Sequence, residues 1–239
     1  EASEEGTPQG GPLSPLLSNI MLNELDKELE RRGLPFVRYA DDSMIFCKSK
    51  RSAMRVKESI TRFIENTLYL KVNREKTVVS YVRGVKYLGY SFYVMKGKCQ
   101  LTVHPKSKAR MKSRLKELTS RSNGWGYAKR KQKLKEYIKG WVGYYHLANM
   151  KRLLLETDEW LRRRIRMCIW KAWKKVKTRV ANLIRCGISK HKAYEWGNTR
   201  KGYWRIADSY ILHRAITKEH LCRAGYATLM GAYLEWHPK

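Results

Sequence analysis

Apolar and polar positions divide the chain into a mixed first part and a helical second part. Over residues 13–30, apolar side chains recur every three or four positions, which is the spacing of an amphipathic helix. A second helical pattern covers about 53–64. Short runs typical of β-strands are found at 36–39, 44–47, 77–82, 85–94 and 99–103, with Gly97 at a turn. This order predicts helices that cover one face of an antiparallel sheet.

From residue 104 onward the pattern is helical. Apolar stripes beginning at Met111 and Leu134 predict two helices, and a stripe from Leu161 to Val176 predicts a third. The last stretch mixes Gly, Trp and Tyr with short helical runs. We therefore predict an α+β chain of three parts, residues 1–103, 104–180 and 181–239.

Charge adds a functional contrast to this division. The 239 residues contain 51 Lys and Arg and 21 Asp and Glu, a formal net charge of +30. Residues 1–100 carry a net charge of only +5, since 17 basic side chains face 12 acidic ones, and the remaining +25 lies in residues 101–239. No apolar run is long enough for a membrane span, and five Cys without a CxxC pair favour a reducing compartment. We expect a cytoplasmic protein that binds a polyanion, with nucleic acid the leading candidate.

Two adjacent carboxylates, Asp41 and Asp42, lie between the apolar runs at 36–39 and 44–47. Asp is common in turns, so a solvated turn is one interpretation. The other is a Mg²⁺ site, because paired carboxylates repel each other and hard oxygen ligands suit this cation. Two such ions activate the attacking oxygen and stabilise the leaving one in phosphoryl transfer.

A loop rich in glycine and proline precedes the first helix, with the sequence Gln9-Gly10-Gly11-Pro12-Leu13-Ser14-Pro15. Glycines let a backbone approach a ligand closely, and a helix N-terminus offers N–H groups to an anion. An ordinary loop would also use any one of these residues. The whole run, followed about 30 residues later by Tyr39-Ala40-Asp41-Asp42, is much less common by chance.

With these motifs the chain resembles the reverse transcriptases, or maturases, encoded by group II introns, especially the bacterial type without an endonuclease domain. The Gln9 run is similar to motif B of that family, the Tyr39 run to motif C, residues 70–77 to motif D, and residues 85–90 to the primer grip. The resemblance implies a partial reverse-transcriptase palm over 1–103, an all-α basic thumb or maturase domain X over 104–180, and a small DNA-binding region over 181–239.

The resemblance also implies roles for single residues. Asp41 and Asp42 would be catalytic ligands of a two-metal Mg²⁺ site whose third Asp, in motif A, is not in this chain. Lys76 is a candidate general acid for the pyrophosphate leaving group, or one surface lysine among many. Leu88 and Gly89 would belong to the primer grip, although Gly89 also suits a strand kink. The nucleotide- and template-binding residues would be Gln9, Gly10, Gly11, Pro12, Tyr39, Ala40 and Asn73.

The cations of the second part are candidates for binding a phosphate backbone, although charge runs are often just solvated helix faces. Among the interleaved aromatic residues, Trp125, Tyr127 and Tyr144 lie off the apolar stripes and are the candidates for base stacking. The candidate nucleic-acid-binding residues are Lys106, Lys108, Arg110, Lys112, Arg114, Lys129, Arg130, Lys131, Arg162, Arg163, Arg164, Lys174, Lys175, Arg200 and Lys201.

Together these features predict an RNA-directed DNA polymerase that copies group II intron RNA from a DNA primer and also assists splicing. Its partners would be intron RNA, target DNA, dNTPs and, if the chain is half of a split enzyme or a cleavage product, an N-terminal fragment in trans. It would act as a ribonucleoprotein in the bacterial cytoplasm. Two alternatives are a splicing cofactor that lacks catalysis and a related retroelement polymerase without a splicing role.

Overall fold

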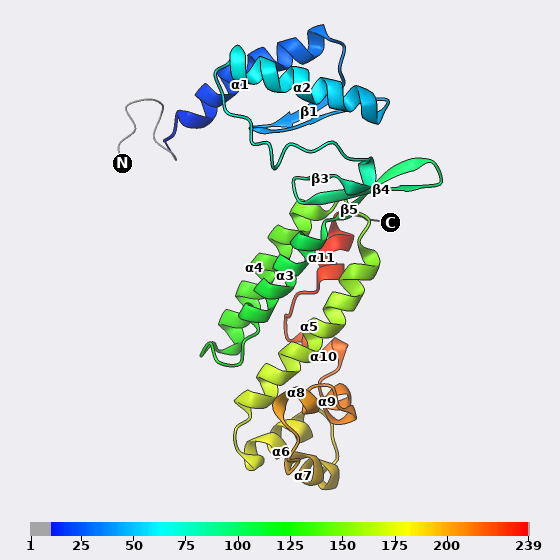
Figure 1. The fold of residues 1–239 in the computed structure, drawn as a ribbon. Helices are drawn as coiled ribbons and strands as arrows, with labels where there is room; N and C mark the ends of the chain where they lie inside the picture. Colours follow the sequence, from blue (N-terminus) through cyan, green and yellow to red (C-terminus); the bar gives the residue numbers. More distant parts are fainter. Residues whose placement is uncertain (1–10, 239) are drawn as a thin grey trace. The chain divides into compact units, whose positions relative to one another are not determined.

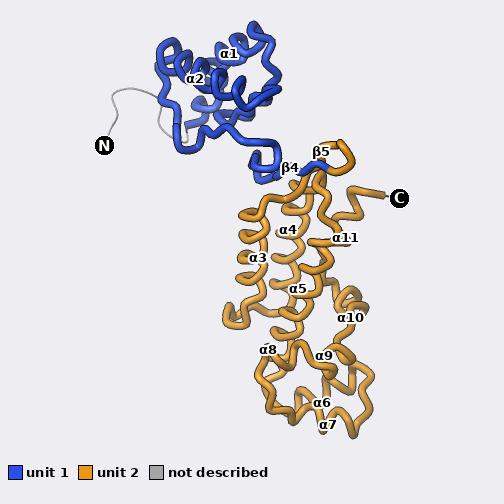
Figure 2. The backbone as a smooth tube through the Cα atoms, turned by 45° about the vertical axis from the view of Figure 1, so that its right-hand side comes forward, with its two compact units in different colours: residues 1–94 blue, residues 95–239 orange. Residues whose placement is uncertain are grey.

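The computed structural model describes residues 11–238 and divides the chain into two compact units, residues 1–94 and 95–239 (Figures 1 and 2). The first unit contains both helices and strands, and the second is largely helical after one strand. The α+β class predicted from the sequence is therefore confirmed.

Two helices and a hairpin form the core of the first unit. The elements are α1 (Ser14–Arg31), β1 (Phe36–Tyr39), β2 (Asp42–Ile45) and α2 (Lys50–Asn66). Pro15 is tolerated in the first turn of α1, where its missing N–H costs nothing. Leu25 and Leu29 of α1 are buried with Ile60 of α2, and Phe36 and Ile45 of the strands pack against them. Both predicted helices and both short strands are thus present, although the second strand lies at residues 42–45 rather than 44–47.

The segment after α2 differs from the prediction in two places. The strand predicted at 77–82 is wrong, because this segment is a loop with a 3₁₀ turn at Val82–Gly84, and its residues Val78 and Tyr81 are exposed. The predicted strand 85–94 is two strands, β3 (Lys86–Tyr87) and β4 (Tyr90–Met95). Between them, Leu88 and Gly89 both have positive φ, 48° and 80°, as a two-residue type I′ hairpin turn requires.

The sheet of β3 and β4 ends with β5 (Lys98–Val103), in the order β3-β4-β5. Gly97, with a φ of 73°, lies in the turn between β4 and β5, as the sequence predicted. The two sheets of the described residues are separate, so the strands do not form one continuous sheet.

Three long helices build the second unit (Figure 1). They are α3 (Pro105–Leu118), α4 (Tyr127–Tyr145) and α5 (Lys151–Ala172), and α3 packs against both others. The apolar stripes read from the sequence supply many of the buried side chains, which include Met111, Leu115, Leu134, Ile138 and Leu161. Trp170, which lies off the predicted third stripe, is also buried. The third predicted helix is wrong at its end. It stops at Ala172, and Val176 begins a separate helix, α6 (Val176–Arg185).

Five short helices follow α6 and complete the same unit. They are α7 (Lys190–Gly197), α8 (Tyr203–Ile206), α9 (Tyr210–Ala215), α10 (Lys218–Arg223) and α11 (Leu229–Glu235). The first of them packs on α6, α8 packs on α5, and α11 returns to pack against α4 and α5 (Figure 1). The C-terminal segment is thus folded onto the long helices.

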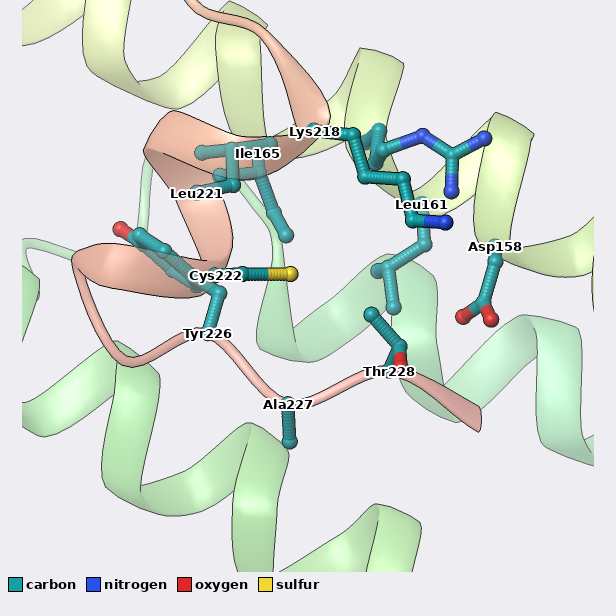
Figure 3. A pocket seen from close by; sticks show the side chains of 10 residues that line it. Asp158, Leu161, Ile165, Lys218, Leu221, Cys222, Tyr226, Ala227 and Thr228 are labelled. Carbon is teal, nitrogen blue, oxygen red and sulfur yellow. The ribbon is translucent and has the colours of Figure 1, made fainter. Parts of the chain in front are cut away.

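A buried carboxylate anchors this return. Asp158 of α5 accepts hydrogen bonds from the backbone N–H groups of Leu229 and Met230, at 2.8 and 3.0 Å, in the first turn of α11. Figure 3 shows Asp158 beside a pocket lined by α5, α10 and the segment before α11. Burial raises the pKa of this carboxyl, and the two hydrogen bonds only partly oppose the shift.

Candidate catalytic hairpin and nucleic-acid interface

The two adjacent carboxylates lie at the tip of the hairpin formed by β1 and β2. Tyr39 pairs with Asp42, so Ala40 and Asp41 are the two loop residues. Ala40 has a φ of 51°, a left-handed conformation that costs energy for a residue with a Cβ. Asp41 and Asp42 are both exposed, and neither makes an ion pair or side-chain hydrogen bond within the described part of the chain.

An arginine underlies this tip. The burial pattern of β1 alternates, which places Arg38 on the inner side with Phe36, and its side chain is only 13% exposed. Its guanidinium binds the Asp26 carboxylate of α1 through Nε and Nη2, at 2.8 and 2.5 Å. Its Nη1 donates to the Asn19 side chain and to the Ala40 carbonyl, both at 3.0 Å.

A tyrosine hydroxyl completes the surroundings of the hairpin. The hydroxyl of Tyr87 on β3 is buried and has no hydrogen-bond partner among the described residues. Burial and the negative charge of Asp42 raise the Tyr87 pKa, whereas the charge of Arg38 opposes the shift. Tyr87 therefore lies within electrostatic range of the carboxylate tip.

The tip suits Mg²⁺ in the chemistry of its donors, because two exposed carboxylates without a protein cation offer hard oxygen ligands. It supplies two acidic side chains only. Among the described residues, no group of three or more His, Cys, Asp or Glu side chains converges on one point. A complete two-metal site requires further ligands from substrate or another segment.

Of the predicted nucleotide-binding residues, Gln9 and Gly10 lie outside the described residues. Gly11 and Pro12 precede α1, and the Gly11 carbonyl accepts a hydrogen bond from the Ser14 N–H. Tyr39, 65% exposed, and Ala40 flank the carboxylates at the hairpin tip. Gly11, Pro12, Tyr39 and Ala40 all belong to the same compact unit, residues 1–94.

Asn73 and Lys76 lie together in the loop after α2. The Asn73 side-chain oxygen accepts a hydrogen bond from the Lys76 N–H, and the backbone carbonyl of Asn73 accepts one from the Thr77 hydroxyl. The amide oxygen of Asn73 is therefore engaged in shaping its own turn, while Lys76 is exposed. Leu88 and Gly89, the predicted primer-grip residues, form the β3–β4 turn described above.

The predicted nucleic-acid-binding cations fall into three sets. Those of the first set are exposed, although Arg114 also pairs with Glu117. The exposed set is Lys106, Arg110, Lys112, Arg114, Lys129, Lys174, Lys175, Arg200 and Lys201. Lys108 and Arg162 are half-buried. Four others bind the protein itself, and they are Arg130, Lys131, Arg163 and Arg164.

The inward cations satisfy backbone carbonyls. Arg164 donates to Thr119 Oγ1 and to the carbonyls of Lys116 and Thr119, and Arg130 lies 3.4 Å from the Ser120 carbonyl. These carbonyls end α3, where a helix leaves acceptors unsatisfied and its dipole attracts positive charge. Arg163 pairs with Asp208 and stacks on Trp204, and Lys131 donates to the Ala224 carbonyl.

The sequence patterns did not single out Arg38, Asp26 and Tyr87 near the carboxylates, nor Asp158 under α11. One signal was available for Arg38, because alternation in β1 assigns it to the inner face, where a charge requires a partner. Asp26 and Asp158 lie inside helices that contain several acidic residues, and the sequence alone does not show which of these acids has a structural partner.

Comparison with known proteins identifies the two parts of the chain. A family model described as reverse transcriptase (RNA-dependent DNA polymerase) matches residues 1–92. A second model, for the maturase-specific domain of group II introns, matches residues 108–187. The chain belongs to the group II intron reverse transcriptases and maturases. The carboxylate hairpin lies in the first matched region of this family, and most of the predicted cations lie in the second.

Three relatives illustrate the similarity. Protein YkfC of Escherichia coli K12 is 32% identical over 124 residues, covering 37% of this chain and 32% of the relative. Group II intron-encoded protein LtrA of Lactococcus lactis is 29% identical over 154 residues, covering 37% of this chain and 26% of the relative. The retron Ec86 reverse transcriptase of E. coli is 32% identical over 77 residues, covering 30% of this chain and 24% of the relative. The aligned regions span between 24% and 32% of these relatives' length.

Proposed function

We propose that this chain is part of an RNA-directed DNA polymerase that copies group II intron RNA from a DNA primer and binds that RNA to assist splicing. One observation carries the proposal. The same chain joins a hairpin with two exposed carboxylates, in the reverse-transcriptase region, to an exposed set of cations in and around the maturase region.

In this proposal Asp41 and Asp42 hold Mg²⁺, the metal that reverse transcriptases generally use. Bound Mg²⁺ would supply activation of the primer 3′ oxygen and stabilisation of the leaving pyrophosphate. The chain's own contribution is to hold the two carboxylates side by side on a short hairpin. A third carboxylate comes from outside the described residues, on an upstream segment or a second chain.

An uncovered helix face supports this need for another segment. The N-terminal half of α1 exposes apolar side chains to solvent, and such a stripe ordinarily packs on something. Exposure is 57% for Leu16, 60% for Ile20 and 63% for Leu13 just before the helix, whereas Leu25 and Leu29 in the other half are buried. A reverse-transcriptase fragment that packs on this face is the proposed carrier of the third carboxylate.

The remaining predicted roles are part of the same proposal. Gln9, Gly10, Gly11, Pro12, Tyr39, Ala40 and Asn73 contact nucleotide or template, and Leu88 and Gly89 contact the primer. Lys76 is exposed on its loop, and its ammonium group would protonate the pyrophosphate as the bond breaks. The functional division is 1–103 for the palm, 104–180 for the maturase domain and 181–239 for DNA binding.

The exposed cations are the proposed contacts to RNA and DNA phosphates, with Arg200 and Lys201 on the DNA side. In the described residues, no helix is both long and apolar enough to cross a membrane. We propose that the protein acts as a cytoplasmic ribonucleoprotein with its intron RNA.

The maturase match separates this proposal from the two alternatives. A retroelement polymerase without a splicing role has no evident need for a maturase-specific domain, which matches residues 108–187 here. A splicing cofactor without catalysis would not need the paired carboxylates of the hairpin. Both halves are present, which favours a protein with both activities.

The test uses the full protein with its upstream segment. Asp41→Ala and Asp42→Ala are expected to lower primer extension at least about 100-fold, since each removes a group that helps stabilise transition-state charge. Intron RNA binding and splicing assistance should remain. Glu30→Ala, an exposed acid at the far end of α1, is the matched control and should extend primers normally.

A second arm tests the missing ligand. Residues 1–239 alone are expected not to extend a primer, and activity should appear when a fragment carrying the third Asp is added. Undiminished cDNA synthesis by the Asp41→Ala protein would contradict the metal assignment.

A further inference from the structure

Arg38 holds three partners at once. It binds the Asp26 carboxylate through two nitrogens, the Asn19 side-chain oxygen and the Ala40 carbonyl. A guanidinium suits this task because its planar fork presents several donors in fixed directions. Asn19 and Asp26 lie seven residues apart on α1 and thus on one helix face. The arginine therefore ties the hairpin tip to α1.

The contact between Arg38 and the hairpin tip is made at Ala40, the residue with the strained backbone. Ala40 has a φ of 51°, and the carbonyl that Arg38 binds belongs to this same residue, immediately before Asp41. A strained conformation persists only when its surroundings hold it. The hydrogen bond from Arg38 is one such restraint, because it fixes the peptide unit that joins Ala40 to Asp41.

Charge balance is the second part of the arrangement. Asp26 neutralises Arg38 within a close ion pair, in which the two side chains are 20% and 13% exposed. No ion pair joins Arg38 to Asp41 or Asp42 in the described residues, although the arginine is on the adjoining strand. The two tip carboxylates thus keep their charge available for a cation. Without Asp26, the guanidinium would be free to pair with them and compete with a metal ion.

We propose that Arg38 is a positioning residue for the metal-binding carboxylates and that Asp26 prevents it from neutralising them. The inference rests on the proposed polymerase function. It assigns no contact between Arg38 and nucleotide or metal. The arginine acts through the Ala40–Asp41 peptide, and the aspartate acts through the arginine.

The kinetic test compares Arg38→Gln, Arg38→Lys and Asp26→Asn in the full protein, with primer extension followed over a range of Mg²⁺ and dNTP concentrations. Loss of a group that orients metal ligands typically lowers metal affinity or activity about 10- to 100-fold, and we expect that range for Arg38→Gln. The loss should fall on kcat and on the Mg²⁺ midpoint, with the KM for dNTP nearly unchanged. Raising Mg²⁺ should restore part of the activity.

The other two variants separate geometry from charge. Arg38→Lys keeps the charge but cannot hold all three partners, so it should recover only part of kcat. Asp26→Asn keeps the shape but frees the guanidinium, so it should raise the Mg²⁺ midpoint more than it lowers the kcat measured at saturating Mg²⁺. Arg31→Gln is the matched control, because Arg31 is an exposed arginine that pairs with Glu28 on the same helix, and its loss should change neither quantity.

A second readout needs neither metal nor turnover. Hydrogen exchange in metal-free protein should quicken at residues 39–43 in Arg38→Gln while the amides of α2 keep their wild-type rates. Faster exchange throughout residues 11–94, or an unchanged Mg²⁺ midpoint, would show a general structural role and overturn the inference. Loss of activity in Asp41→Ala together with normal kinetics in Arg38→Gln would overturn this inference alone. An active Asp41→Ala protein would instead overturn the proposed function.

Discussion

The two units use charge in contrasting ways. In residues 1–94 the carboxylates of Asp41 and Asp42 are exposed, and the inward charge beneath them is Arg38. In residues 95–239 the exposed charges are mostly cations, and the inward set includes the acid Asp158. Both inward groups have partners. Arg38 binds the opposite charge of Asp26, and Asp158 accepts hydrogen bonds from backbone N–H groups in the first turn of α11.

Burial and partners, rather than residue type, therefore separate structural charges from functional ones. Arg164 and Lys112 have the same formal charge, but Arg164 donates to the end of α3 while Lys112 is exposed. Burying a charge is tolerated only with such partners. A net charge of +25 over residues 101–239 therefore overstates the number of cations available for nucleic acid.

The largest effect on RNA binding is expected from exposed cations. In Lys106→Ala/Arg110→Ala, which lie four residues apart on α3, intron RNA affinity should fall. The slope of log affinity against log salt should also become less steep, by about 0.7 to 0.9 for each lost phosphate contact. Filter binding at several salt concentrations measures both. Lys133→Ala is the control, because Lys133 pairs with Glu136 and its loss also removes a positive charge. An equal loss in that control would contradict a localised interface.

An inward cation should affect stability instead. Arg164→Gln leaves carbonyls at the end of α3 without their donor, which costs about 1 to 3 kcal/mol of unfolding free energy. Urea unfolding of the full protein measures this cost. Below the transition, the salt dependence of RNA binding should match wild type. A reduced salt slope with unchanged stability would place Arg164 in the interface.

The smallest effect concerns Asp158 and pH. Burial raises its pKa in the folded protein above that in the unfolded chain, so the folded state binds more protons between the two values. Asp158 therefore lowers the free energy of unfolding at pH values above its folded pKa, and this loss of stability should diminish as the pH falls through that pKa. Thermal unfolding of wild type and Asp158→Asn from pH 7 to pH 4 tests this. On acidification the wild type should gain stability relative to the variant. A gain of the variant relative to the wild type would contradict the raised pKa of Asp158.

Much of the fold followed from local patterns, and the errors have physical causes. Helical stripes located α1, α3 and α4, because each buries one face against a neighbour. The strand predicted at 77–82 failed because β-type residues without a pairing partner stay in a loop. The break at Leu88 was hidden because Leu seldom adopts a positive φ.

The site was predictable only in part. Adjacent Asp residues between two apolar runs were enough to predict the hairpin, since that signal is local. The contacts of Arg38 with Asn19 and Asp26 join residues 19 and 12 positions apart, and those of Arg164 with α3 span more than 40. Such pairings depend on how the elements pack, and one sequence does not reveal them.

Exposed acids and exposed cations are expected to serve separable activities. The most direct measurement assays one preparation of the full protein for primer extension and for intron RNA binding, comparing Asp41→Ala with Lys106→Ala/Arg110→Ala. We predict that the first loses extension and keeps wild-type RNA affinity, while the second binds RNA more weakly with a smaller salt slope. The second should also extend a saturating primer–template at nearly the wild-type rate. Parallel loss of both activities in both variants would contradict this separation.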